Sequence, residues 1–331
     1  MKFKKCAALL LVSSCLLTGC TTSSAKKVDS KYVVASLEKR NKTKNIFADN
    51  LYKDIIDNSS NNSTVFNAVL QNLVDQKFPV NDDMKEDAAT IIKQIKSAYK
   101  SNYGDNYKDS LNQALTSAGY KNLSEYRQRM IKQIQYANFL LDYIDDHFDD
   151  VFNDYYQQCA PKYVSLIKIS VSDTSSPTDN ETSKLNEVKE LISNTDKSFG
   201  DIAQDYSDDS TSSKKGSLGI VDSKDTSGIA NSYGKDVFNA IEALSEGQVS
   251  DVITGDDGYY FVKVTSTDKK TLKKELKKTD IDSPLLAYDD YLQYVVYNSY
   301  KINYKDKDIK KIVQEVVNKA LEERKTERGE A

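Results

Sequence analysis

The sequence predicts an α+β protein in which helical segments flank a small domain built on a sheet. Before residue 162 and after residue 268, apolar residues recur at spacings of three and four, the period of a helix with one buried face. Inside that range, KYVSLIKISV and YYFVKV are rich in β-branched and aromatic residues, which is typical of strands. We therefore expect helices over 31–161 and 269–331, and a small antiparallel sheet surrounded by short helices over 162–268.

The segment before residue 162 shows a series of apolar helical stripes and no alternation of the kind that strands show. Its stripes are Val65, Phe66, Val69, Leu70, Leu73 and Val74; Met84, Ala88, Ile91, Ile92, Ile95, Ala98 and Tyr99; and Tyr126, Met130, Ile134, Ala137, Leu141 and Ile144. After residue 268, Ser283 and Pro284 resemble an N-cap followed by proline at the first helical position. A last stripe contains Ile309, Ile312, Val313, Val316, Val317 and Ala320.

The middle segment follows the order β-α-α-β-α-β, with a possible extra strand at its end. Its first strand begins after Pro161, and its last follows the turn sequence GDDG. Between two of its helices and strands lies a polar loop, YSDDSTSSKKGSLG, with Asp209 near its middle. Such loops often carry functional residues.

The N-terminus has the pattern of a secretory signal over residues 1–19. Lys2, Lys4 and Lys5 precede an apolar run from Ala7 to Leu17, which is shorter than the roughly 20 residues that a spanning helix needs. The sequence LTGC that follows resembles the lipobox of bacterial lipoproteins. This implies that Cys20 carries a lipid anchor at the extracytoplasmic face of the cell membrane, with 20–30 forming the lipidated cysteine and a polar tether. An ordinary cleaved signal with a chance cysteine is the alternative.

Composition narrows the classes of partner and of chemistry. Loss of the three signal lysines lowers the formal net charge from −4 to −7, which argues against nucleic acid as a partner. Cys159 is then the only thiol besides Cys20, so no internal disulfide is possible, and we interpret it as a packed apolar residue. DDHFDD is interpreted as a solvated helix end. No motif indicates a metal or a cofactor.

The middle segment resembles a parvulin-type peptidyl-prolyl isomerase domain. Parvulins show an F-x-x-x-A-x-x-x-S helix, an S-x-D/C-x-S loop, a G-G-D-L-G turn, an F-x-x-A-x-x-x-L-x-x-G helix and a G-x-H-I-I strand. Here the matching stretches are FGDIAQDYSDDS, KGSLG, VFNAIEALSEG and GYYFV. With its flanking helices and lipobox, the whole chain is similar in layout to PrsA-type extracytoplasmic foldase lipoproteins. In that family, the N- and C-terminal helices pack together as a chaperone-like lobe around the inserted isomerase domain.

The resemblance implies a set of site residues and shows where this chain departs from the family. Asp209 occupies the family's Cys or Asp position, whereas Ser165 and Tyr260 are read at the positions of its two histidines. The proline pocket is expected to include Val237 or Phe238 as its floor, with Tyr233 and Leu218 beside it. Hydroxyls donate and accept hydrogen bonds but do not titrate near neutrality as histidine does.

Two functions follow from this resemblance. The first is a membrane-anchored foldase that isomerises X-Pro bonds in unfolded or newly secreted polypeptides, without a cofactor, as a monomer or a homodimer. The alternative is a holdase chaperone whose parvulin domain has lost catalysis. A solute-binding lipoprotein would instead show repeated βα units, which the helical flanks argue against.

Overall fold

The computed structural model describes residues 27–28, 31–39, 42–194, 196–277 and 280–330, and it divides the chain into two units. Residues 81–290 form the first, which we call the sheet unit. Residues 27–80 and 291–330 form the second, which we call the terminal unit because both ends of the described chain contribute to it.

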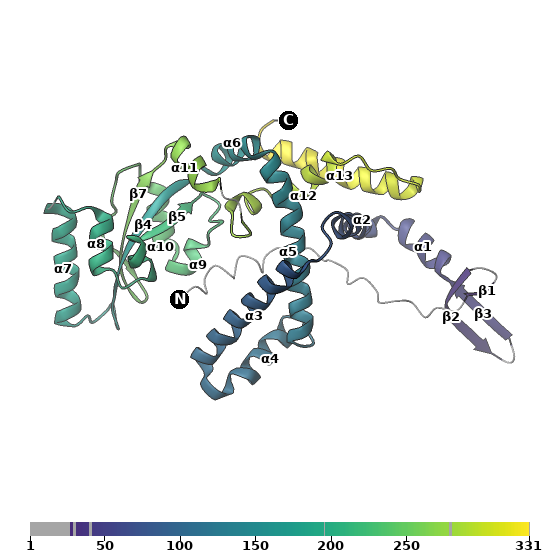
Figure 1. Ribbon diagram of the computed structural model, residues 1–331, viewed down its shortest axis with the longest axis horizontal. Helices are drawn as coiled ribbons and strands as arrows, with labels where there is room; N and C mark the ends of the chain where they lie inside the picture. The colour runs from purple at the N-terminus through teal and green to yellow at the C-terminus, as the bar shows by residue number, and fades with distance from the viewer. Residues whose placement is uncertain (1–26, 29–30, 40–41, 195, 278–279, 331) are drawn as a thin grey trace. The chain divides into compact units, whose positions relative to one another are not determined.

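The sheet unit is built on a four-stranded antiparallel sheet with the strand order β5-β4-β7-β6. Figure 1 labels β4, β5 and β7 of this sheet. The strands are β4 (Lys162–Ser170), β5 (Ser217–Val221), β6 (Ile253–Gly255) and β7 (Gly258–Ser266). The longest ladder joins β4 to β7, from Tyr163 opposite Ser266 to Ser170 opposite Gly258. The predicted antiparallel sheet and the α+β class are confirmed.

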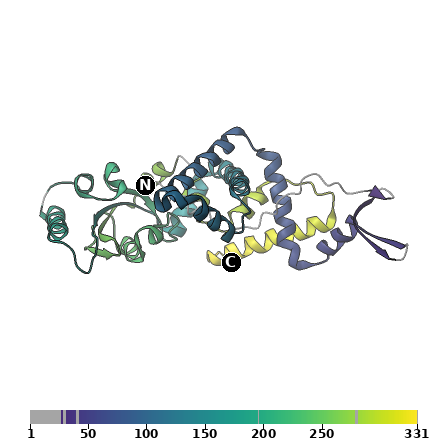
Figure 2. The same ribbon diagram turned by 90° about the horizontal axis from the view of Figure 1, so that it is seen from below.

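Short helices cover both faces of this sheet (Figures 1 and 2). On one face lie α7 (Asp179–Asn194) and α8 (Phe199–Tyr206), packed on Ile167, Ile169 and Phe261. On the other lie α9 (Ile229–Tyr233) and α10 (Lys235–Ala243), packed on Val164, Leu166 and Val262. Alternate residues of β4 therefore serve opposite cores, as the period of two requires.

Two of the helices that precede the sheet in this unit begin at polar caps. Asn81 and Asn122 accept hydrogen bonds from the backbone at the starts of α3 and α5, and Gly119, at φ 85°, follows α4. The helices that precede and follow the sheet are α3 (Asp82–Tyr103), α4 (Tyr107–Ser117), α5 (Leu123–Asp146), α6 (Phe148–Cys159) and α11 (Lys269–Leu276), with 3₁₀ turns at Gly104–Asn106, Ser210–Lys214 and Pro284–Leu286.

A buried carboxylate ties α6 to the loop after β5. Asp222 is fully buried and accepts hydrogen bonds from the Tyr155 hydroxyl at 2.8 Å and from the amide of Lys224 at 3.0 Å. Tyr155 also packs edge-on against Tyr288, at 5.3 Å between ring centroids. Burial, followed by the nearby Asp222 charge, raises the pKa of Tyr155, so its hydroxyl stays a neutral donor.

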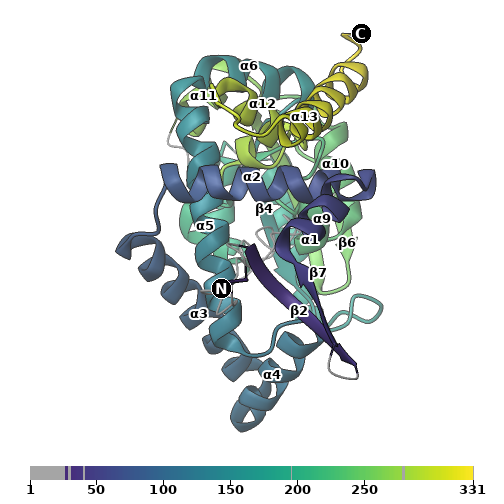
Figure 3. The same cartoon turned by 90° about the vertical axis from the view of Figure 1, so that its right-hand side faces the viewer.

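The terminal unit joins two helices from opposite ends of the chain, α2 (Asn62–Lys77) and α13 (Lys307–Glu327) (Figure 3). Their buried residues fall within the stripes that the sequence predicts, although Val69, Leu73, Ile309 and Val316 of those stripes are only partly buried. Phe66 of α2 stacks on Tyr294 at 4.9 Å between ring centroids. The remaining elements are β1 (Lys27–Val28), β2 (Lys31–Lys39), β3 (Lys42–Phe47), α1 (Ala48–Ile56), the 3₁₀ turn Ser59–Asn61 and α12 (Leu292–Ser299).

Two features of the N-terminal region differ from the sequence prediction. The prediction of helix from residue 31 is wrong, because β2 and β3 form an antiparallel pair with β1 along the other edge of β2. The segment KYVVAS is rich in β-branched residues and holds no helical stripe, which explains the strand. In addition, the region 31–161 is shared between two units that divide at residues 80 and 81, two residues after Pro79.

Candidate functional site

The loop that carries Asp209 binds along the edge of β4. Ser207 Oγ accepts a hydrogen bond from the Lys168 amide at 3.0 Å, and the Asp208 amide donates to the Lys168 carbonyl at 2.8 Å. The Ser170 amide donates to Asp208 Oδ2 at 2.9 Å. Because β5 pairs only with residues 162–165 of β4, this loop satisfies backbone groups that the ladder leaves open. The position of Asp209 is therefore set by the sheet.

Asp209 has two neighbours that matter for its role. Its Oδ1 accepts a hydrogen bond from the Thr211 amide at 2.9 Å and so caps the 3₁₀ turn Ser210–Lys214. The Tyr233 hydroxyl lies 3.5 Å from each carboxylate oxygen, at the outer limit of hydrogen bonding. The aspartate thus combines a capping contact with a phenol held close to its charge.

Tyr233 and Tyr260 bring two phenols together on the face of the sheet that α9 and α10 cover. Their rings meet edge to face with centroids 6.2 Å apart. Tyr260 lies opposite Lys168 across the β4–β7 ladder, and its hydroxyl donates to Asp257 Oδ1. Burial is the first cause that raises the pKa of both phenols, so both stay neutral donors at neutral pH.

The predicted pocket residues pack against the same core as Tyr260. Val237 is buried with 1% of its surface exposed, whereas Leu218, Tyr233 and Phe238 are partly buried at the border of that core. Of Val237 and Phe238, the two candidates for the floor of the proline pocket, Phe238 is therefore the one that retains exposed surface. It is the side chain that a proline ring could reach without opening the core.

The structure does not bring Ser165 to this group. Ser165 and Leu166 are consecutive in the β4–β7 ladder, and Leu166 belongs to the core that contains Tyr260. Adjacent strand residues point to opposite faces. Ser165 is buried and lies on the side of Ile167, so β4 presents Leu166 to Tyr260 instead.

The sequence analysis did not predict two residues of this face, Lys168 and Asp257. Lys168 Nζ forms an ion pair with Asp257 and lies 5.5 Å from the centroid of the Tyr260 ring. The signal was present in the GDDG turn, because a turn between paired strands returns its side chains to the neighbouring strand. It was read as a turn only.

Other predicted features fall in different places. Cys20 lies outside the described residues, and Cys159 is buried at the end of α6. Across the described part of the chain, no three histidine, cysteine or acidic side chains are grouped as metal ligands. The search of these same residues for a helix long and apolar enough to cross a bilayer found none.

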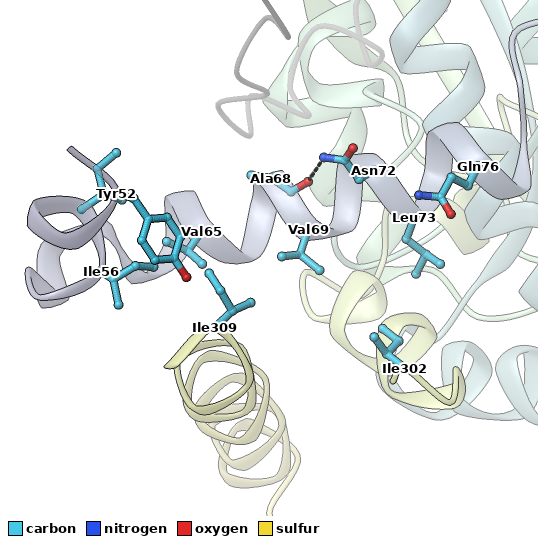
Figure 4. Close-up of a pocket in the computed structure, with 11 residues that line it drawn as sticks. Tyr52, Ile56, Val65, Ala68, Val69, Asn72, Leu73, Gln76, Ile302 and Ile309 are labelled. Carbon is cyan, nitrogen blue, oxygen red and sulfur yellow. Dashed lines mark hydrogen bonds between the residues drawn. The ribbon is translucent and has the colours of Figure 1, made fainter. Parts of the chain in front are cut away.

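A second candidate site is an apolar groove in the terminal unit, about 460 Å³ in volume (Figure 4). It lies between α1, α2 and the start of α13, with an amide rim from Asn72 and Gln76. Its apolar lining consists of Tyr52, Ile55, Ile56, Val65, Ala68, Val69, Leu73, Ile302 and Ile309.

Comparison with known proteins defines the class of the sheet domain. Residues 166–266 match the family model described as Rotamase: PPIC-type PPIASE domain. This segment therefore belongs to the PPIC-type, or parvulin, family of peptidyl-prolyl isomerase domains.

Two relatives of this chain share the name Foldase protein PrsA. The chain is 31% identical over 159 residues to Foldase protein PrsA of Staphylococcus aureus (strain bovine RF122 / ET3-1), covering 46% of this chain and 47% of that protein. It is 35% identical over 136 residues to the Foldase protein PrsA of Staphylococcus epidermidis (strain ATCC 35984), covering 39% of each. The matches thus span less than half of these relatives. The crystal structure of PrsA from Bacillus subtilis covers 85% of this chain at 21% identity, with a TM-score of 0.39. The predicted resemblance to PrsA-type foldases is confirmed.

Proposed function

We propose that this chain is an extracytoplasmic foldase that isomerises X-Pro bonds in newly exported polypeptides. The observation that carries the proposal is the parvulin-type domain over 166–266, with Asp209 held beside two neutral phenols on one face of its sheet. Anchoring through a lipid on Cys20 is part of the same proposal, and no cofactor or nucleic acid is involved. Release of a Cys20→Ser variant from the membrane fraction would support the anchor, and retention would contradict it.

The chemistry asks little of the protein beyond shape and polarity. An X-Pro amide resists rotation by about 18–20 kcal/mol because twisting removes its resonance. Uncatalysed isomerisation takes tens to hundreds of seconds, slow enough to limit folding. A site lowers this barrier by gripping the proline ring and favouring the twisted amide over the planar one. Here Phe238 and Leu218 offer the apolar grip, while Tyr233 and Asp209 supply the polar side.

The first experiment is a prolyl isomerisation assay on the chain starting at Thr21, with Asp209→Ala and Asp209→Asn compared. We expect Asp209→Ala to lower kcat/KM by roughly tenfold. Asparagine caps as well as aspartate, so Asp209→Asn keeps the contact with Thr211 and removes only the charge.

The two variants separate catalysis from capping. Loss of activity in both assigns the carboxylate charge to the reaction. Loss in Asp209→Ala alone assigns Asp209 to the cap, and equal rates in all three proteins remove it from any role in catalysis. A wild-type rate no faster than buffer would overturn the isomerase proposal itself.

A second function, binding of unfolded chains without catalysis, is favoured by the groove of the terminal unit. Tyr52 and Ile55 of α1 line this groove together with apolar residues of α2, and both are exposed. A groove of this kind suits an apolar segment of an unfolded polypeptide, which gains free energy by leaving water.

Suppression of client aggregation tests this second function. We expect Leu73→Ser, in the groove, to weaken suppression, whereas Leu51→Ser, exposed outside the lining, serves as the matched control. Suppression by a wild-type chain that shows no isomerase rate would make the holdase the correct reading. Equal loss in both variants would contradict a role for the groove.

Self-association is the remaining part of the proposal. In the terminal unit β3 is an edge strand, and the β2–β3 pair exposes Tyr32, Val34 and Ile46. Exposed edges of this kind template pairing with another chain. We expect sedimentation to show a dimer that Ile46→Lys weakens; a strictly monomeric wild-type chain would contradict this.

A further inference from the structure

Lys168 contacts both halves of the candidate site through different groups. Its peptide N–H and C=O bind Ser207 and Asp208, which precede Asp209 directly. Its ammonium binds Asp257, the residue that also accepts the Tyr260 hydroxyl. One residue of β4 thereby connects the loop carrying the acid to the strand carrying the phenol.

The side-chain contacts restrict the ring of Tyr260. Asp257 receives the Tyr260 hydroxyl on Oδ1 and the Lys168 ammonium on Oδ2, so the ammonium orients the carboxylate that holds the phenol. The Tyr260 ring also lies close to the backbone of Gly255 in β6, where a Cβ would lie 2.6 Å from Tyr260 Cε2. The Lys168 Nζ adds a cation 5.5 Å from the ring centroid.

The burial of Lys168 separates this contact from an ordinary surface ion pair. Exposed pairs contribute little because water screens them and long side chains lose entropy. The Lys168 side chain is only 15% exposed, although Asp257 is 64% exposed. A lysine held in this way loses little further freedom on binding its partner, and charge-assisted hydrogen bonds are the strong ones.

We propose that Lys168 is a positioning residue that holds the Tyr260 phenol, through Asp257, in the orientation in which its ring meets Tyr233 beside Asp209. The inference rests on the proposed isomerase function for its catalytic consequence, but the placement of Tyr260 can be measured without it. Lys168 itself need not touch the substrate.

The test uses aromatic NMR of the chain from Thr21 with ¹³C-labelled tyrosine. The Tyr260 ring signal is identified by its absence in Tyr260→Phe. We expect Lys168→Met, which keeps the apolar stem, and Asp257→Asn, which breaks the link from the other side, to move or broaden this signal. Lys168→Arg restores it. Lys263→Met is the matched control, because Lys263 lies on the same sheet opposite Ser165, on the face away from Tyr260.

Activity provides the second readout. We expect Lys168→Met to lower kcat/KM by roughly tenfold in the wild-type background and by less than twofold in Tyr260→Phe, because the two changes remove one effect. Additive losses would assign Lys168 a general structural role and overturn the proposal. So would an unchanged Tyr260 signal in folded Lys168→Met. A wild-type chain without isomerase activity overturns the proposed function instead, while the NMR comparison still decides the role of Lys168.

Discussion

Gly216 is a residue at which the backbone of the site is tightly constrained. It has φ 76°, a conformation that favours glycine, and its carbonyl accepts the Leu166 amide at 2.8 Å. A Cβ at this position would lie 2.5 Å from the Leu166 carbonyl oxygen and 2.8 Å from Ala203 Cβ. The glycine allows the Asp209 loop to return against β4.

Gly216→Ala is therefore expected to destabilise the sheet unit by roughly 3 kcal/mol or more, combining backbone strain with overpacking. Gly219→Ala is the matched control, since Gly219 has φ 83° but nothing within 4 Å of a built Cβ. It should cost only about 1–2 kcal/mol. Urea unfolding measures both, and equal losses would show that the close approach to Leu166 does not matter.

At the level of residues, the sequence predicted part of the site. The resemblance to parvulin motifs pointed to Asp209, Tyr260, Tyr233 and Phe238, and the structure places these residues near one another. Ser165 could not be placed reliably, since a shift of one residue in a strand moves a side chain to the other face. Lys168 was missed because the GDDG sequence that carries its partner Asp257 was interpreted only as a turn, and a turn sequence does not say which strand residue its side chains contact.

Among the elements, α10 is a helix whose C-terminal carbonyl groups are capped by the side chain of a strand residue. The Lys162 ammonium, at the start of β4, donates to the carbonyls of Ile241, Glu242 and Leu244 at 3.0, 2.6 and 3.0 Å. These carbonyls lie at the C-terminal end of α10, where helix carbonyls lack intrahelical partners and a cation is favourable. The contact fixes α10, and with it Val237 and Phe238, against the sheet.

Lys162→Met is expected to lower the free energy of unfolding of the sheet unit by roughly 2 kcal/mol, the scale of hydrogen bonds to a charged group. Lys235→Met, at the exposed N-terminal end of the same helix, removes a charge where the helix dipole gives it no support and should be close to neutral. The unfolding curves of the two variants decide the point. A loss in Lys235→Met equal to that in Lys162→Met would contradict the capping role.

In the terminal unit, α1 is linked to α13 by a hydrogen bond from the Tyr52 hydroxyl to Asp306. The bond raises the pKa of Tyr52 to about 12 and is the first cause that lowers the pKa of Asp306. Folding therefore favours a neutral phenol and an ionised carboxylate. The stabilisation should be complete between about pH 4 and pH 10, the ordinary pKa values of the two groups.

The pH dependence follows from these directions. Stability from this link should fall as the pH drops below about 4 through the lowered pKa of Asp306, and should fall again as the pH rises towards about 12 through that of Tyr52. The measurement is the difference in unfolding free energy between wild type and Tyr52→Phe across this range. A difference that does not vary with pH would show that the ring, and not the hydrogen bond, carries the contact.

For whole elements, the sequence prediction succeeded where an apolar stripe extends over many residues and failed where the apolar runs are short. The stripes of α2, α3, α5 and α13 extend over several turns, so tertiary packing and propensity agree. Residues 31–47 give only short runs, and their strands pair with each other without a buried face that would enforce alternation. Among the residues of this pair whose exposure is described, none is buried.

On the scale of the whole molecule, the terminal unit is discontinuous in the sequence, because the sheet unit is inserted between its two segments. The terminal unit contains residues from both ends of the described chain, so the parvulin domain is an insertion in the sequence between α2 and α12. The core of the terminal unit forms only when α2 and α13 meet. The sheet unit, in contrast, contains two cores of its own, one on each face of β4 and β7.

Each unit should therefore lose its structure separately when its own core is damaged. Val313 in α13 is 1% exposed, and Val313→Asp would bury an unpaired carboxylate, which costs several kcal/mol. We expect amide hydrogen exchange to accelerate throughout 44–80 and 291–330 while the sheet unit keeps its protection and the isomerase rate. Asn318→Asp places the same charge on the exposed side of the same helix and should change neither. Loss of protection in β4 and β7 to the same extent would show that the two units unfold as one, and that catalysis depends on the pairing of the chain's ends.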